Sequence, residues 1–110
     1  TLFRSSAASD VYKRQGDEIA KALGDKKVAI LQNHGILTTG PSVDIALWFY
    51  MSMERCCQAQ LMAEAAGKPI SVSHETAIKT REFIANDIAA WASYQPAFDK
   101  IVKMQPDLLD

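Results

Sequence analysis

The residues of this sequence with the clearest capacity for chemistry are two histidines, two cysteines and a few serines. His34 stands between two short apolar runs and is followed by Gly35, which leaves room for a chain turn or an approaching ligand. A neutral imidazole in that place is a suitable nitrogen ligand for a divalent metal. A lone histidine is more often structural, however, and zinc needs three or four ligands, with no second one here at a motif-like spacing. The residues alone leave both interpretations of His34 open.

The other reactive side chains have weaker contexts. His74, beside Ser73, is interpreted as a solvated or capping residue at a helix start. Cys56 and Cys57 are adjacent on a predicted helix, where they are poorly placed to pair with each other, and are interpreted as small buried hydrophobes. Free cysteines favour a reducing, cytoplasmic setting. No serine lies in a nucleophile motif, and no glycine-rich phosphate loop is present.

Composition excludes some partners. The 110 residues carry a formal net charge of −1, which gives no electrostatic case for nucleic acid or an anionic membrane surface. The longest apolar run, from Ile45 to Met51, is far shorter than a membrane span. We therefore expect no nucleic-acid and no membrane partner.

The first fifteen residues differ from the rest. Residues 1–15 read TLFRSSAASDVYKRQ, lack a periodicity that continues into the following sequence, and do not form a secretory signal. They resemble translated sequencing-adapter sequence, so they are predicted to be a non-native or disordered segment. Residues 16–110 are predicted to be the domain proper.

The elements that must position His34 are short strands. After a helical stretch over Asp17 to Leu23, the apolar runs Val28–Gln32 and Ile36–Thr39 predict two strands, and Asn33-His34-Gly35 interrupts them. Two strands alone seldom make a stable sheet, so further strands are expected upstream of this sequence.

Helices fill the remainder. Ser42 is a good N-cap, and no glycine or proline occurs from Val43 to Ala66, which predicts one long helix ended by Gly67. Its second face mixes Trp48 with methionine, arginine and glutamine, a composition typical of either a protein contact or a second packed layer. Ser73 is predicted to cap a helix over about His74 to Trp91, and Pro96 to begin a last helix reaching Met104.

The run from Val28 to Gly67 resembles the C-terminal core of class II aldolase/adducin domains. The likeness lies in an apolar strand, the Asn33-His34-Gly35 triplet, a second apolar strand ending in glycine, and a long helix. That helix contains a stretch that resembles the family pattern. The matching residues are Glu54, Arg55, one of Cys56 and Cys57, and one of Gln58 and Gln60. The tail from Tyr94 to Val102 resembles a bacterial and fungal subgroup.

This resemblance implies the fold class, an α/β chain that is part of a three-layer α/β/α domain with a mostly antiparallel sheet and whose N-terminal half is missing. It implies three histidine ligands for a divalent metal, often zinc, of which His34 is the third. The other two, in an H-x-H, and the general acid/base are expected upstream, so no catalytic residue is assigned here. The 110 residues alone are expected to be inactive.

Two functions follow from the resemblance. The first is retro-aldol cleavage, or related epimerase or decarboxylase chemistry, on a small sugar or sugar phosphate, by a homo-oligomer that is commonly a tetramer. The second is an adducin-like, non-catalytic role in binding the actin cytoskeleton. Tyr94, in the tail, is a candidate to reach a neighbouring subunit's active site in the first case.

Overall fold

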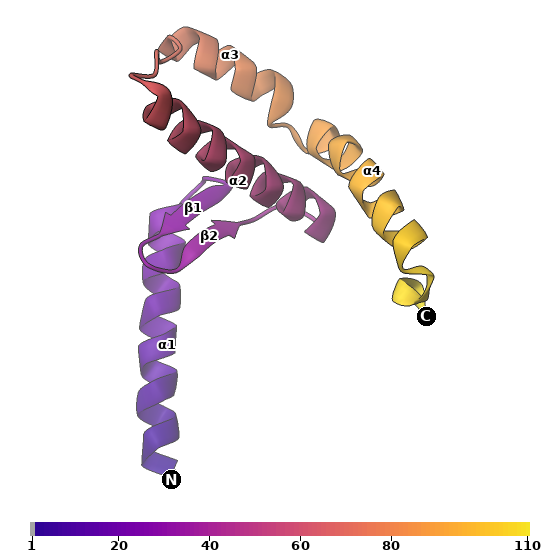
Figure 1. The fold of residues 1–110 in the computed structure, drawn as a ribbon. Coiled ribbons are helices and arrows are strands. Elements are labelled where there is room, and N and C mark those ends of the chain that lie inside the picture. The colour runs from indigo at the N-terminus through magenta and orange to yellow at the C-terminus, as the bar shows by residue number, and fades with distance from the viewer. Residues whose placement is uncertain (1) are drawn as a thin grey trace.

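The computed structural model describes the backbone of residues 2–110 and the side chains of residues 13–110. The described elements, in chain order, are α1 (Leu2–Leu23), β1 (Val28–Leu31), β2 (Gly35–Thr38), α2 (Val43–Ala66), α3 (His74–Ile84), α4 (Asp87–Met104) and the short 3-10 helix η1 (Pro106–Leu109), as Figure 1 shows.

The two predicted strands form an antiparallel hairpin. Val28 pairs with Thr38 at its base and Leu31 with Gly35 at its tip. Residues on the two strands that lie directly opposite share a face of the sheet, so Val28, Ile30, Ile36 and Thr38 lie on one face. The hydroxyl of Thr38 on this face donates to the carbonyl of Ala46 (2.9 Å), which identifies it as the face against α2.

Helix α2 has the predicted bounds, Val43 to Ala66, and is 24 residues long. Ser42 occupies the N-cap position, but its side chain makes no capping bond to the main chain. Its hydroxyl donates instead to the carboxylate of Asp44, which also accepts from the N–H of Ile45 (3.0 Å). Both hydrogen bonds lower the pKa of Asp44 below its usual value, and the bond from Ser42 has the larger effect.

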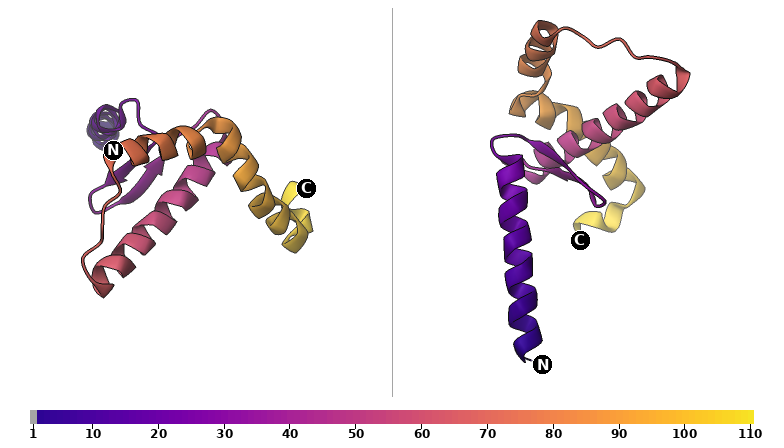
Figure 2. Two further views of the ribbon diagram at one scale, coloured as in Figure 1. Left: turned by 90° about the horizontal axis from the view of Figure 1, so that it is seen from above. Right: turned by 90° about the vertical axis from the view of Figure 1, so that its left-hand side faces the viewer.

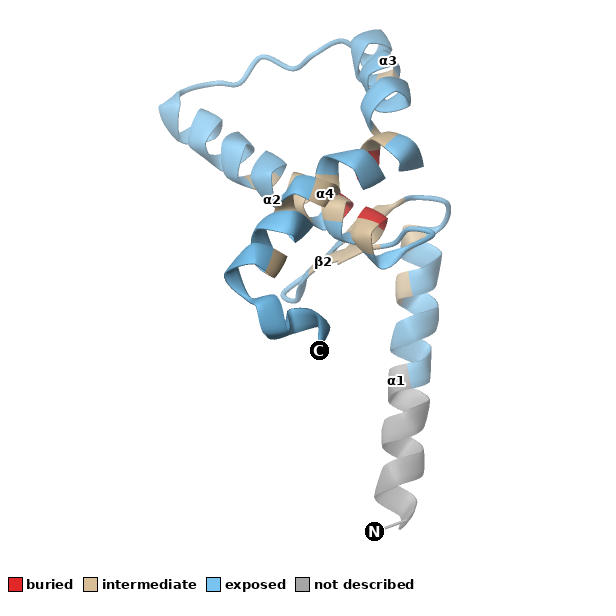
Figure 3. Ribbon diagram, turned by 90° about the vertical axis from the view of Figure 1, so that its right-hand side faces the viewer, coloured by how far each residue is buried: buried red, intermediate tan, exposed pale blue. Residues whose placement is uncertain are grey.

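The core lies where α2 crosses α4. Ile45 and Phe49 of α2 and Ala90 of α4 are buried, and Ala90 is 0% exposed, with Val28, Trp48 and Ala85 packed around them. In Figure 3 the buried residues lie together at this crossing, whereas the other residues of both helices are half-buried or exposed. Gly40 fits closely here, because a Cβ at that position would lie 3.0 Å from the Ile45 side chain and the Ala46 nitrogen.

The elements extend away from this small core. The radius of gyration is 18.3 Å, whereas a compact domain of this length has about 13 Å. Figures 1 and 2 show α1 running away from the hairpin, and α3 separated from α2 along most of its length. Among the described elements α3 contacts only α4, and it holds no buried residue. A large part of the apolar surface is therefore uncovered.

The prediction of the two C-terminal helices was wrong in its boundaries. The expected helix from His74 to Trp91 ends at Ile84, and α4 begins at Asp87 and continues through Pro96 to Met104. The break occurs because the Asn86 side chain caps α4 by accepting from the N–H of Ala89 (2.9 Å). The capping role of Ser73 is confirmed by its bond from the Thr76 N–H.

Helix α1 is also longer than predicted. It begins at Leu2 rather than Asp17, and so runs through most of the segment 1–15. That segment contains no glycine or proline, so its residues permit a helix even without an amphipathic pattern. A non-native origin of residues 1–15 stays a prediction. None of the helices in the described part of the chain is long and apolar enough to span a bilayer.

Candidate metal centre

His34 lies at the tip of the hairpin. Residues 32–34 form the turn between β1 and β2, and the N–H of His34 closes it by donating to the carbonyl of Leu31 (3.1 Å). Asn33 adopts a left-handed conformation (φ 60°), which asparagine tolerates better than most residues. Gly35 has φ 142°, which is strained for any residue with a Cβ. Both residues flanking His34 therefore suit the backbone that presents it.

The imidazole is exposed and its side chain has no hydrogen-bond partner among the described residues. It is thus free to offer a ring nitrogen to a ligand at the end of the sheet. This matches the chemistry expected of a metal ligand, since a neutral imidazole is a common donor to divalent metals. His34 fits a metal site as one donor.

The rest of a ligand set is not brought together in the described part of the chain. No group of three or more His, Cys, Asp or Glu side chains lies close enough there to hold a metal ion. His74 is exposed at the start of α3, and Cys56 and Cys57 are free thiols on α2. Cys56 is exposed and Cys57 half-buried, so the interpretation of both as buried residues was wrong. A zinc site needs two or three donors besides His34, and the described residues do not supply them as a cluster.

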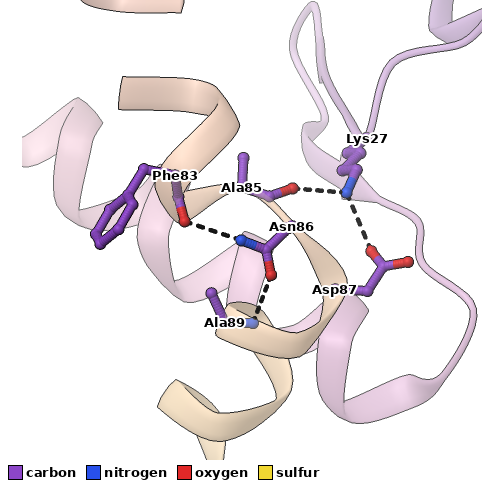
Figure 4. A network of polar contacts seen from close by, with 6 residues as sticks. All are labelled: Lys27, Phe83, Ala85, Asn86, Asp87 and Ala89. Carbon is purple, nitrogen blue, oxygen red and sulfur yellow. Dashed lines mark hydrogen bonds and ion pairs between the residues drawn. The ribbon is translucent and has the colours of Figure 1, made fainter. Parts of the chain in front are cut away.

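The base of the hairpin is fixed by a polar network that Figure 4 shows. The ammonium of Lys27, immediately before β1, donates to the carbonyl of Ala85 (2.8 Å) and pairs with the carboxylate of Asp87 (3.1 Å). It also lies 4.7 Å from the centre of the Phe49 ring, a cation–π distance. One side chain thereby joins the hairpin, α2 and the junction of α3 with α4.

Asn86 completes this junction. Its amide nitrogen donates to the carbonyl of Phe83 (2.8 Å), near the end of α3, while its oxygen caps α4. Asn86 thus hydrogen-bonds to the last turn of α3 and to the first turn of α4. Sequence reasoning assigned no such role to Lys27 or Asn86. The polar Asn86-Asp87 pair in the middle of a predicted helix was the only available signal.

Tyr94 was predicted to precede a helix, but it lies inside α4. It is half-buried, and its ring centre lies 6.4 Å from that of Phe98. The neighbouring Gln95 donates to the carboxylate of Asp44 (3.3 Å) and so ties α4 to the start of α2. A contribution of Tyr94 to a neighbouring subunit's site stays a prediction.

Residues 4–61 match the family described as Class II Aldolase and Adducin N-terminal domain, which is more than half of the chain. The chain therefore belongs to the class II aldolase/adducin family. Members of this family are commonly metal-dependent.

Several individual proteins are similar to it. The chain is 38% identical over 96 residues to the decarboxylase NovR of Streptomyces niveus, covering 87% of this chain and 36% of that protein. It is 36% identical over 96 residues to a 4-hydroxy-3-prenylphenylpyruvate oxygenase/4-hydroxy-3-prenylbenzoate synthase of Streptomyces roseochromogenus subsp. oscitans, covering 87% and 35%. A solved structure, the L-fuculose 1-phosphate aldolase of Glaciozyma antarctica PI12, superposes with a TM-score of 0.78 at 38% identity, covering 81% of this chain and 36% of that one.

These matches confirm the predicted fold class. The small antiparallel sheet and its helices correspond to part of a class II aldolase domain. The chain spans about a third of the length of the relatives it matches.

Proposed function

We propose that this segment belongs to a divalent-metal-dependent enzyme that cleaves a carbon–carbon bond next to a carbonyl group, and that His34 is one of its metal ligands. The observation that carries the proposal is the exposed imidazole of His34, which has no hydrogen-bond partner among the described side chains, at the tip of a hairpin whose base is bonded to α2. Family membership supports metal dependence, and the similar proteins include one named an aldolase and one named a decarboxylase.

The metal, for which we propose zinc, supplies a Lewis acid that stabilises negative charge on a carbonyl oxygen as the carbon–carbon bond breaks. His34 contributes a nitrogen lone pair and must be neutral to do so. The turn at Asn33 and Gly35 sets the position of the ring, and the Lys27 network keeps the hairpin in place. The general acid/base is assigned to polypeptide outside these 110 residues.

We further propose a small sugar or sugar phosphate as substrate and a cytoplasmic homo-oligomer as the working form. The aldolase match supports the sugar phosphate, because that relative acts on L-fuculose 1-phosphate by its name. The two Streptomyces relatives carry names that refer to a decarboxylase and to an aromatic pyruvate derivative. A substrate screen must therefore contain both 2-oxo acids and sugar phosphates.

The decisive experiment measures bound metal in the longer polypeptide that carries this segment. Protein purified with zinc would be compared with His34→Ala and with His74→Ala as a matched control, since both histidines are exposed and His74 lies on a different element. We expect about one metal ion per chain in the parent and in the control, and a loss of at least tenfold in affinity for His34→Ala.

A folded parent that binds no metal would overturn the enzyme proposal and favour the adducin-like binding role. Equal metal content in the parent and both variants would contradict the assignment of His34. With metal bound, release of an aldehyde from sugar phosphates indicates aldol cleavage, and release of carbon dioxide from 2-oxo acids indicates decarboxylation.

A further inference from the structure

The turn that carries His34 contains an unusual backbone conformation. Asn33 has φ 60°, and in the described part of the chain it is the one residue other than glycine with a positive φ. Gly35, on the other side of His34, has φ 142°. A side chain with a Cβ makes such angles costly, and glycine and asparagine adopt them most readily. The two positions that flank His34 therefore restrict which residues can occupy them.

The positive φ of Asn33 is part of how the turn closes. The N–H of His34 donates to the carbonyl of Leu31 (3.1 Å), which makes Asn33 the third residue of a four-residue turn. A positive φ at the third residue but not at the second is the pattern of a type II turn, which favours glycine or asparagine there. Rotation of Asn33 to a negative φ would turn the peptide group between Asn33 and His34, break this bond and redirect the imidazole.

The side chain of Asn33 does not account for the residue. It is exposed, as are those of Gln32 and His34, and its amide hydrogen-bonds to none of the described side chains. What Asn33 contributes to the described structure is therefore the conformation of its backbone. Because one exposed hydrogen bond adds little stability, the turn can open while the base of the hairpin stays in place.

We propose that Asn33 is a positioning residue for His34, and that its preference for a positive φ sets the metal affinity of the site. Only molecules in which the turn is closed present the imidazole as the structure has it. The apparent dissociation constant rises in proportion as the fraction of such molecules falls. The inference rests on the proposed function, because it concerns the same histidine acting as a metal ligand, and it names the residue that regulates this ligand.

Substitutions at position 33 separate the backbone from the side chain. Asn33→Val removes the amide and adds a β-branched side chain, which strongly disfavours a positive φ, so metal affinity should fall on the order of tenfold. Asn33→Gly also removes the amide but adopts a positive φ freely, so affinity should stay within about threefold of the parent. Asn33→Ala should lie between these two variants.

Gln32→Val provides the matched control. Gln32 is exposed in the same turn, but it is not among the residues with a positive φ. The same new side chain at this position should therefore change metal affinity by less than about threefold.

The test uses the longer polypeptide that carries this segment. Zn²⁺ would be titrated into the parent and each variant in competition with a chromophoric chelator, and the absorption spectrum of the Co²⁺ form would be recorded. Urea unfolding with a chelator present shows that each variant is folded and measures its stability without metal. We expect Asn33→Val to bind more weakly and to change the Co²⁺ spectrum, with a urea midpoint close to that of the parent.

Three results would overturn the inference. An Asn33→Val variant with unchanged affinity and a lower urea midpoint would give Asn33 a structural role alone. An equal loss in Asn33→Gly and Asn33→Val would assign the effect to the amide side chain, and an equal loss in Gln32→Val would assign it to any change in the turn. A parent that binds no metal refutes the proposed function itself, whereas a metal-binding parent whose affinity does not depend on residue 33 refutes this inference alone.

Discussion

The two ends of the hairpin differ in how many contacts their residues make with the rest of the described structure. At the base, Thr38 bonds to α2, Lys27 bonds to the junction of α3 with α4, and Val28 packs against the core. At the tip, His34 is exposed and no other metal-binding side chains gather around it in the described part of the chain. The described residues thus contain the support of the proposed ligand, but they do not gather a set of further ligands around it.

This difference separates two requirements that an active site usually combines. A ligand must be held in position, and it must be surrounded by its chemical partners. The first requirement is met by contacts at the base of the hairpin, whereas the described residues do not meet the second at its tip. Substitutions at the base should therefore change stability, and substitutions at the tip should change binding with little effect on stability.

The largest effect is expected for Phe49→Ala at the base. Phe49 is one of three buried core residues and also lies beneath the Lys27 ammonium. Its truncation should lower the free energy of unfolding by about 3 kcal/mol, measured by urea denaturation. The matched control is Tyr50→Ala, since Tyr50 is the next residue of α2 and is exposed. An equal loss for both variants would show that the core is not at the crossing of α2 and α4.

A smaller effect is expected for Lys27→Met. The variant keeps most of the aliphatic length but removes the bond to Ala85 and the ion pair with Asp87, which should cost about 1–2 kcal/mol. Because both partners of the ion pair are partly exposed, most of this loss comes from the bond to the Ala85 carbonyl.

Lys26→Met provides the control for Lys27. Lys26 is more exposed and, within the described residues, pairs with its neighbour Asp25 alone, so its loss should change the free energy of unfolding by less than about 0.5 kcal/mol. Both variants would be measured by the same urea titration. If Lys26→Met were the more destabilising of the two, the role of Lys27 as the connection between three elements would be wrong.

The smallest effect on folding is expected for His34→Ala at the tip. The imidazole is exposed and hydrogen-bonds to none of the described side chains, so the free energy of unfolding without metal should change by less than about 0.5 kcal/mol. Thermal unfolding with a chelator present measures this. A large loss of stability would mean that His34 has a structural role at the tip. Substitutions at the tip and at the base would then both act on stability.

The local elements around His34 could be predicted from the sequence. Two apolar runs separated by Asn33-His34-Gly35 indicated the hairpin, and the absence of glycine and proline from Val43 to Ala66 gave the bounds of α2. In these segments composition and backbone preference favour the same structure, and tertiary contacts do not change it.

The junction of α3 with α4 could not be predicted in this way. Asn86 is only moderately unfavourable inside a helix, and Pro96 is a plausible helix start, so the pattern favoured a break at the wrong place. The actual break depends on Asn86 capping α4 and on Lys27, about sixty residues earlier, bonding to Ala85. A contact between such distant positions leaves no local signal.

The exposed segment between α2 and α3 has a practical consequence. Residues 67–73 are all exposed, lie outside helices and strands, and connect two parts that remain in contact through α2 and α4. Backbone with so few constraints tolerates cleavage and insertion. The segment is accordingly a suitable place to divide the chain into two complementing pieces, or to insert a reporter domain, without disturbing the hairpin that presents His34.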